Sequence, residues 1–163
     1  MNRTIVALVE DKPGVLNRIA SMFRRRGFNI ASLAVGHSEQ IGYSRMTFVV
    51  EGDEFTIDQV TKQLNNLIDV INVSKLEESK IVMRELAMIK VSTTKANRAE
   101  IMQLVEIFRA NIVDVSSHAI IVEVTGEEEK IESLCALLKP FGIKEIMRTG
   151  RVAMIRGVYE QKG

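Results

Sequence analysis

The order of apolar patterns along the chain limits its possible folds more than any single motif does. Alternating apolar and polar side chains indicate a strand, and apolar residues spaced three or four apart indicate a helix. In the first half these patterns give the order strand, helix, strand, strand, helix, strand, which is that of the split βαβ or ferredoxin-like unit. The expected elements are a strand at 5–9, a helix from Val15, a strand at 29–35, a strand at 46–50, a helix opening at 56–59 with capping-box spacing and a strand at 70–73.

The second half repeats this order of elements, although the two halves share few residues. Strands are expected at 86–91, 112–115 and 120–124, helices after residues 97–100 and 125–128, and one or two closing strands within 143–155, interrupted at Gly150. We therefore predict an α+β protein of two tandem ferredoxin-like βαββαβ domains. Their predicted limits are 1–78 and 84–163, with a linker at 79–83.

Each predicted domain is close to the lower size limit for an independent hydrophobic core. Two helices cover one face of a four-stranded sheet and leave the other face open. Val6 and Leu8 put apolar side chains on that open face. An apolar open face needs a partner, which is either the other domain or a second protomer, and a homodimer is the commonest solution.

The composition excludes several classes of protein. With 22 basic and 21 acidic residues the net charge is +1, so no strong field attracts nucleic acid or anionic lipid. Cys135 is the single cysteine, which rules out a disulfide within one chain. No apolar run is as long as a transmembrane helix, and residues 1–4 lack the apolar core of a signal peptide. We expect a cytoplasmic protein.

No catalytic motif is present in the sequence. A GxGxxG loop, a P-loop and an HExxH pair are all absent. His37 and His118 lie in expected loops, and Cys135 lies inside an expected helix, where it suits a small core position. We predict no catalytic residues, no metal site and no cofactor in this chain.

Two other classes of protein that have this fold do not match the residues of this chain. An RNA-recognition domain needs several aromatic residues on its third strand, whereas the stretch 45–50 offers Phe48 alone. An acylphosphatase-like enzyme needs an arginine in the first loop, where Lys12 is the only cation.

The loop at 11–16 joins the first strand to the first helix. Pro13 suits the first position of a helix, and Gly14 leaves the backbone uncovered. The first N–H groups of a helix lack partners within it and attract anions such as a carboxylate. With Asp11 placed to receive an ammonium group, this loop could hold both ends of a free amino acid. The alternative is an ordinary strand-to-helix turn.

Several stretches carry a family resemblance. The stretch Asp11-Lys12-Pro13-Gly14-Val15-Leu16, followed by residues 27–30, resembles the ACT domain, a module that senses small molecules. Further stretches, which cover nearly the whole chain in order, resemble the small regulatory subunit of acetolactate synthase (acetohydroxyacid synthase). They are 26–33, 44–47, Arg84-Glu85-Leu86, 108–115 and Arg148-Thr149-Gly150-Arg151-Val152-Ala153.

The resemblance implies a non-catalytic protein whose partner is the large subunit of acetolactate synthase. That subunit carries thiamine diphosphate, Mg²⁺ and usually FAD. The small subunit raises its activity and confers feedback inhibition by valine or another branched-chain amino acid. The alternative is a free-standing ACT-domain protein that senses amino acids.

The resemblance also implies where an effector binds, at an interface between two ACT domains. Backbone N–H groups of one protomer would take the effector carboxylate, and Asp11 or the amide of Asn29 would take its ammonium. The implied effector-binding residues are Asp11, Gly14, Val15 and Leu16 of one protomer, facing Asn29 and Ile30 of the other. The loop at 37–43 is less acidic and poorer in proline than the family pattern. Its role, the preferred amino acid and the surface for the large subunit stay open.

Overall fold

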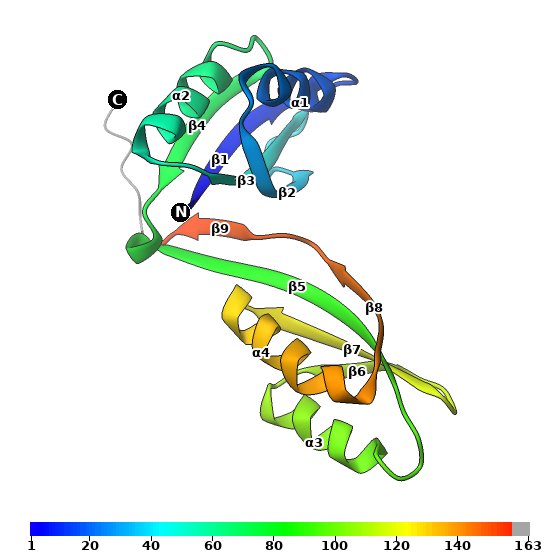
Figure 1. Cartoon of the computed structure of the whole chain (residues 1–163). Helices are drawn as coiled ribbons and strands as arrows, with labels where there is room; N and C mark the ends of the chain where they lie inside the picture. Colours follow the sequence, from blue (N-terminus) through cyan, green and yellow to red (C-terminus); the bar gives the residue numbers. More distant parts are fainter. Residues whose placement is uncertain (158–163) are drawn as a thin grey trace. The chain divides into compact units, whose positions relative to one another are not determined.

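The computed structural model describes residues 1–157, which form two compact units (Figure 1). The first unit comprises Met1–Val82 together with the segment that begins at Arg151, and the second comprises Met83–Gly150. Residues 158–163, which the sequence assigned to the second domain, lie outside the described residues. None of the helices within residues 1–157 is long and apolar enough to cross a membrane.

The first unit is a four-stranded antiparallel sheet with α1 and α2 on one face (Figure 1). Its strand order is β2-β3-β1-β4, so β2 and β4 are the edge strands of this sheet. The expected order of elements is confirmed, with strands longer than the apolar runs that indicate them. The elements are β1 (Asn2–Glu10), α1 (Val15–Arg26), β2 (Asn29–His37), β3 (Tyr43–Glu51), α2 (Glu54–Asn65) and β4 (Val70–Leu76).

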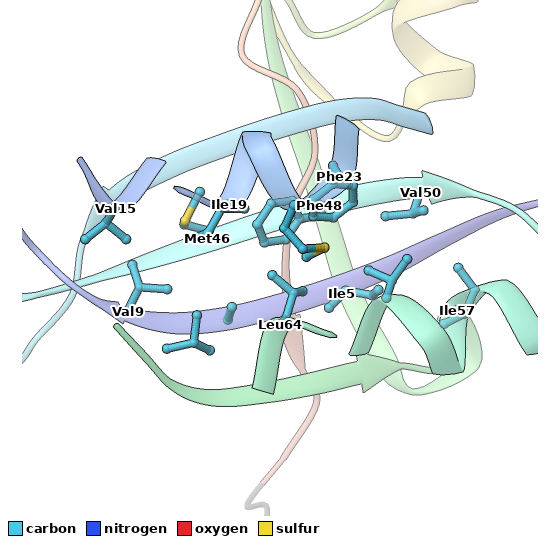
Figure 2. Packing of buried hydrophobic residues seen from close by; sticks show 14 residues of the cluster. Ile5, Val9, Val15, Ile19, Phe23, Met46, Phe48, Val50, Ile57 and Leu64 are labelled. Carbon is cyan, nitrogen blue, oxygen red and sulfur yellow. The ribbon is translucent and has the colours of Figure 1, made fainter. Parts of the chain in front are cut away.

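The core of the first unit lies between the sheet and its two helices (Figure 2). Phe48 on β3 is fully buried and stacks on Phe23 of α1, with ring centroids 5.4 Å apart. Ile5 of β1 and Leu64 of α2 are also fully buried and belong to the same cluster as this pair of rings. Burying side chains of this size stabilises a fold by roughly 1.5–3 kcal/mol each. The core therefore fixes which face of each strand meets the helices.

The opposite face of this sheet differs in part from its prediction. Val6 and Leu8 lie there and are half-buried. Thr4 on the same face is 1% exposed, and its hydroxyl accepts a hydrogen bond from the Arg151 guanidinium at 2.9 Å. A buried threonine hydroxyl needs such a partner, which here comes from the far end of the chain. Part of this face is thus covered by the first unit's own final segment.

One helix start differs from its prediction, and one helix end agrees with it. α2 begins at Glu54, two residues before the expected capping box, because the carboxylate of Asp53 accepts a hydrogen bond from the N–H of Thr56 at 2.8 Å. At the end of α1, Gly27 adopts the left-handed conformation with φ 69°, as its place after three arginines indicates.

The second unit repeats the architecture with α3 and α4 on one face of its sheet (Figure 1). The strand order of its sheet is β6-β7-β5-β8. One or two closing strands were expected within 143–155, and the structure has two, with Gly150 between them. The elements are β5 (Ile81–Ser92), α3 (Arg98–Ile107), β6 (Asn111–Val115), β7 (Ala119–Gly126), α4 (Glu128–Leu138), η2 (Lys139–Phe141) and β8 (Ile143–Arg148). The last strand, β9 (Val152–Ile155), belongs to the first unit.

The expected linker at 79–83 is ordered in the structure. A short 3-10 helix, η1 (Glu78–Lys80), leads directly into β5, which starts at Ile81. The sequence assigned all residues from 84 onward to the second domain, whereas the segment from Arg151 onward groups with the first unit. The contacts that hold it are long-range, so periodicity along the chain does not reveal them.

Candidate functional site

The loop between β1 and α1 leaves a helix N-terminus without a capping side chain. Gly14 is the N-cap residue, with φ 86°, and glycine has no side chain that could cap the helix. α1 has no acidic residue in its first turn. The N–H of Val15 makes only a long hydrogen bond of 3.4 Å to the carbonyl of Lys12. The first N–H groups of this 12-residue helix therefore present a positive pole.

Pro13 does not occupy the first helical position that the sequence indicated for it. The helix starts at Val15, so Pro13 precedes the N-cap. The reason is Gly14, whose left-handed backbone conformation cannot continue into a right-handed helix. The glycine thus sets the helix start, and the proline shapes the loop before it.

Two cations lie beside this helix start. A side chain on Gly14 would meet the Arg18 guanidinium, since the ideal Cβ position is 3.0 Å from Nη1. Arg18 Nε donates to the Asp69 carboxylate at 2.5 Å, which holds the guanidinium in place. Lys12 pairs with Glu10 at 2.7 Å, and this hydrogen bond raises the pKa of Lys12. Each cation is already paired with a carboxylate, so the uncapped helix start is the feature that favours an anion beside Gly14. Arg18 is a neighbour of Gly14 that sequence reasoning missed.

Asp11 connects this loop to the turn between β2 and β3. Its N–H donates to the carbonyl of Gly42 at 2.9 Å, and its Oδ2 lies 3.2 Å from Nδ1 of His37. The Asp11 carboxylate is also partly open to solvent, with about half of the side chain exposed (47%). It can therefore receive a further cationic group. His37, expected in a loop, is the last residue of β2.

The turn at 38–42 is ordered by its own hydrogen bonds. The Ser38 hydroxyl donates to the carbonyl of Tyr43 at 2.8 Å and accepts from the N–H of Gln40 at 3.2 Å. Glu39 and Arg45 form a bidentate ion pair, in which hydrogen bonding to the guanidinium lowers the pKa of Glu39 to about 2. These hydrogen bonds hold the turn in one conformation next to Asp11, whose N–H donates to Gly42 in the same turn.

Val15 and Leu16 differ in what they can offer to a ligand. The Val15 side chain is 4% exposed and belongs to the core, so only its backbone can reach a ligand. Leu16 is 51% exposed, and its side chain is open to contact.

Asn29 and Ile30 lie at the other end of the same sheet. The register pairs Asn29 with Glu51 and Glu51 with Asn2, at the start of β1. The loop at 11–14 follows Glu10, at the end of β1, eight residue steps from Asn2. At about 3.4 Å per residue the two ends are about 27 Å apart. One chain therefore does not bring the two groups of predicted residues into a single site.

The side chains of Asn29 and Ile30 have distinct environments. The amide nitrogen of Asn29 donates to Glu51 Oε2 at 2.7 Å, so its amide oxygen is the group left for another donor. Ile30 is half-buried and packs against the edge of the core.

Two observations within residues 1–157 concern metal binding and a cysteine nucleophile. Within this range no group of three or more His, Cys, Asp or Glu residues is placed to hold a metal ion. Cys135 is half-buried, and burial raises the pKa of its thiol, which disfavours the nucleophilic thiolate.

Two family models match the chain, one for each half. An ACT-domain model of acetohydroxyacid synthase (AHAS) small subunits matches residues 5–72, and a model described as the small subunit of acetolactate synthase matches residues 84–157. The chain belongs to the acetolactate synthase small-subunit family. The first matched range includes all six predicted effector-binding residues, and the second includes the stretches that begin at Arg84 and Arg148.

Members of the acetolactate synthase small-subunit family match along almost their whole length. The chain is 55% identical to a probable acetolactate synthase small subunit from Archaeoglobus fulgidus, over 96% of this chain and 98% of that relative. It is 51% identical to the acetolactate synthase small subunit from Bacillus subtilis, over 99% and 94%. A crystal structure of the small subunit from Thermotoga maritima superposes with a TM-score of 0.92 at 43% identity, covering 98% of this chain and 99% of that one.

Proposed function

We propose that this chain activates the large catalytic subunit of acetolactate synthase and confers feedback inhibition by valine or a related branched-chain amino acid. The observation that carries the proposal is membership of the small-subunit family along both halves of the chain. Catalysis, with thiamine diphosphate, Mg²⁺ and FAD, would belong to the large subunit. The two proteins would meet in the cytoplasm.

The match of the second half favours a subunit over a free-standing amino-acid sensor. A sensor needs only an ACT domain, which residues 5–72 already provide. The additional match over 84–157 is to a part specific to acetolactate synthase small subunits.

The effector site proposed here uses the uncapped start of α1. The N–H groups of Gly14, Val15 and Leu16 would bind the effector carboxylate, and the Arg18 guanidinium, which Asp69 holds in place, lies beside them. Asp11 would receive the ammonium group, because its carboxylate is half-exposed at the same end of the sheet.

A second copy of the chain would complete the site. β2 is an edge strand of nine residues, so a second β2 could pair with it in antiparallel fashion. If the two strands pair about Leu33, residue 29 of one copy lies opposite residue 37 of the other, because both are four residues from Leu33. Asn29 of one copy would then lie near Asp11 of the other, as the 3.2 Å contact between Asp11 and His37 requires.

An effector held between two copies regulates only if it prefers one arrangement of them. The difference in affinity sets the coupling, which is typically about 1–3 kcal/mol. In this proposal the valine-bound dimer is the arrangement that lowers the activity of the large subunit.

The decisive test is an acetolactate synthase assay of the large subunit with and without this chain across a valine titration. We expect higher activity with the chain present and inhibition as valine is added. No association and no change in turnover would refute the proposal. The placement of the carboxylate is tested separately by Gly14→Asp, which adds bulk and like charge there. Normal valine binding by Gly14→Asp in calorimetry would show that placement to be wrong.

A further inference from the structure

Two isoleucine side chains are exposed at the end of the first unit's sheet that carries the loop at 11–14. Ile41, in the turn between β2 and β3, is fully exposed, and Ile68, in the segment between α2 and β4, is 91% exposed. They are the two most exposed large hydrophobic side chains within residues 1–157. A single exposed apolar residue is ordinary on a protein surface, whereas two that lie together form a patch.

Backbone hydrogen bonds place the two isoleucines on either side of the end of β1. The N–H of Glu10 donates at 2.9 Å to the carbonyl of the residue that follows Ile68. The next N–H, that of Asp11, donates at 2.9 Å to the carbonyl of the residue that follows Ile41. Since neighbouring strands are about 4.8 Å apart, the two segments that flank β1 are about 10 Å apart. Ile41 and Ile68 therefore form one exposed patch, which we call the isoleucine pair.

The charged side chains beside the isoleucine pair are paired with one another. Glu39, two residues before Ile41, forms a bidentate ion pair with Arg45. Asp69, the residue after Ile68, accepts a hydrogen bond from Arg18 at 2.5 Å. Because these charges are balanced, the patch has no field of one sign to attract nucleic acid or anionic lipid. An apolar centre with a polar rim is instead the composition of a protein–protein interface.

The dimer proposed above does not bury one isoleucine pair against the other. That dimer joins β2 to β2 in antiparallel fashion, so its two copies run in opposite directions along the joint sheet. The isoleucine pair follows the end of β2 in one copy, and the pair of the other copy lies at the opposite end of the sheet. Each end of the dimer thus offers one isoleucine pair to a different protein.

We propose that the isoleucine pair is a contact surface for the large catalytic subunit of acetolactate synthase, which buries both side chains in apolar pockets of its own. The proposal rests on the function proposed above and names the surface that joins the two subunits. Membership of the small-subunit family supplies the partner. A few residues buried at the centre of an interface carry most of its binding energy. An effector bound at the loop that follows β1 would lie next to this contact, where it can change the affinity between the subunits.

The test titrates the full chain into the large subunit in an acetolactate synthase assay, using the variants Ile41→Ser and Ile68→Ser. Serine removes the apolar side chain and adds no charge near Asp11. The matched control is Phe55→Ser, which removes another exposed apolar side chain, at the start of α2 beyond the other end of β3. For each test variant we expect at least a tenfold rise in the chain concentration for half-activation, and for the control a change within twofold.

Two further measurements separate this contact from other effects of the substitutions. Because neither isoleucine is buried, both test variants should bind valine with a Kd within twofold of wild type in calorimetry. Both should also remain dimers in analytical ultracentrifugation. Half-activation at the wild-type concentration would overturn the proposal, and so would loss of the dimer, because the isoleucine pair would then contact a second copy. A wild-type chain that neither binds nor activates the large subunit would instead refute the proposed function, so the two failures are distinguishable.

Amide hydrogen exchange on the wild-type chain gives an independent test without any variant. We expect the large subunit to slow exchange in residues 38–43 and 66–70, the two segments that contain Ile41 and Ile68. Binding of the large subunit that leaves exchange in both segments as fast as in the free chain would overturn the proposal.

Discussion

The Asp11 carboxylate lies 3.2 Å from Nδ1 of His37, so the loop before α1 and the end of β2 form one local structure. The N–H of Asp11 also donates to the carbonyl of Gly42, which adds the turn between β2 and β3 to the same group. A ligand that contacts Asp11 would therefore act on the edge strand along which a second copy is proposed to pair.

Replacement of Asp11 tests its role with the effector. Asp11→Asn keeps the shape of the side chain and removes the charge that would hold an ammonium group. Hydrogen bonds to charged groups contribute about 1.5–3 kcal/mol, so we expect valine affinity to fall about tenfold or more in calorimetry. Asp58→Asn is the control, because Asp58 is an exposed residue of α2 that pairs with Lys75. Equal affinities for the two variants would remove Asp11 from the site.

Replacement of Gly14 tests the left-handed N-cap. With φ 86°, a residue that carries a Cβ costs about 1–2 kcal/mol there, and that Cβ would also crowd Arg18. We expect Gly14→Ala to lower the free energy of unfolding in urea by about this amount. Gly36→Ala is the comparison, because a Cβ at Gly36 has no neighbour within 4 Å and its φ is ordinary. A Gly14→Ala protein as stable as Gly36→Ala would contradict the described backbone.

The core of the first unit can be tested with two phenylalanines. Phe48 is fully buried and stacked on Phe23, whereas Phe55 is 71% exposed at the start of α2. Phe48→Ala should destabilise the chain by about 3–5 kcal/mol, and Phe55→Ala by less than about 0.5 kcal/mol. Denaturant titration of both variants measures the difference, and equal losses would contradict the packing of Phe48 on Phe23 shown in Figure 2.

The Glu39–Arg45 pair gives a prediction for pH. Its hydrogen bonds lower the pKa of Glu39 to about 2, so the pair's contribution to folding is fully present above the usual range for glutamate. That contribution is lost only as the pH falls toward about 2. An NMR titration of the Glu39 carboxyl should show this, and Arg45→Gln should return its pKa to the usual range. The pKa of Glu77, lowered by Lys80, should stay lowered in Arg45→Gln and serves as the control.

The fold could be predicted from the sequence because helices and strands are indicated by patterns of neighbouring residues. Apolar periodicity predicted both βαββαβ orders, and a glycine after Arg24–Arg26 predicted the end of α1. Element boundaries were less accurate, since α2 is capped by Asp53, which accepts from the N–H of Thr56, and not by Thr56 itself.

Contacts between distant residues were beyond such local patterns. Arg148 and Glu85 are 63 positions apart, and neither stands out by charge alone in a chain with 43 charged residues, 22 basic and 21 acidic. Arg18 was missed as a neighbour of Gly14 for a different reason. Its guanidinium is directed there by Asp69, a residue 51 positions away. The placement of Asn29 across from Asp11 stays a prediction, because it concerns a second copy of the chain.

The return of the chain to its first unit at Arg151 has a consequence for biosynthesis. Thr4 is synthesised before the second unit, but its hydrogen-bond partner Arg151 follows only after the whole of Met83–Gly150 has been made. The second unit can therefore complete its fold before the first one does. A chain truncated after Val82 would retain the core around Phe48 but leave the hydroxyl of Thr4 without its guanidinium donor.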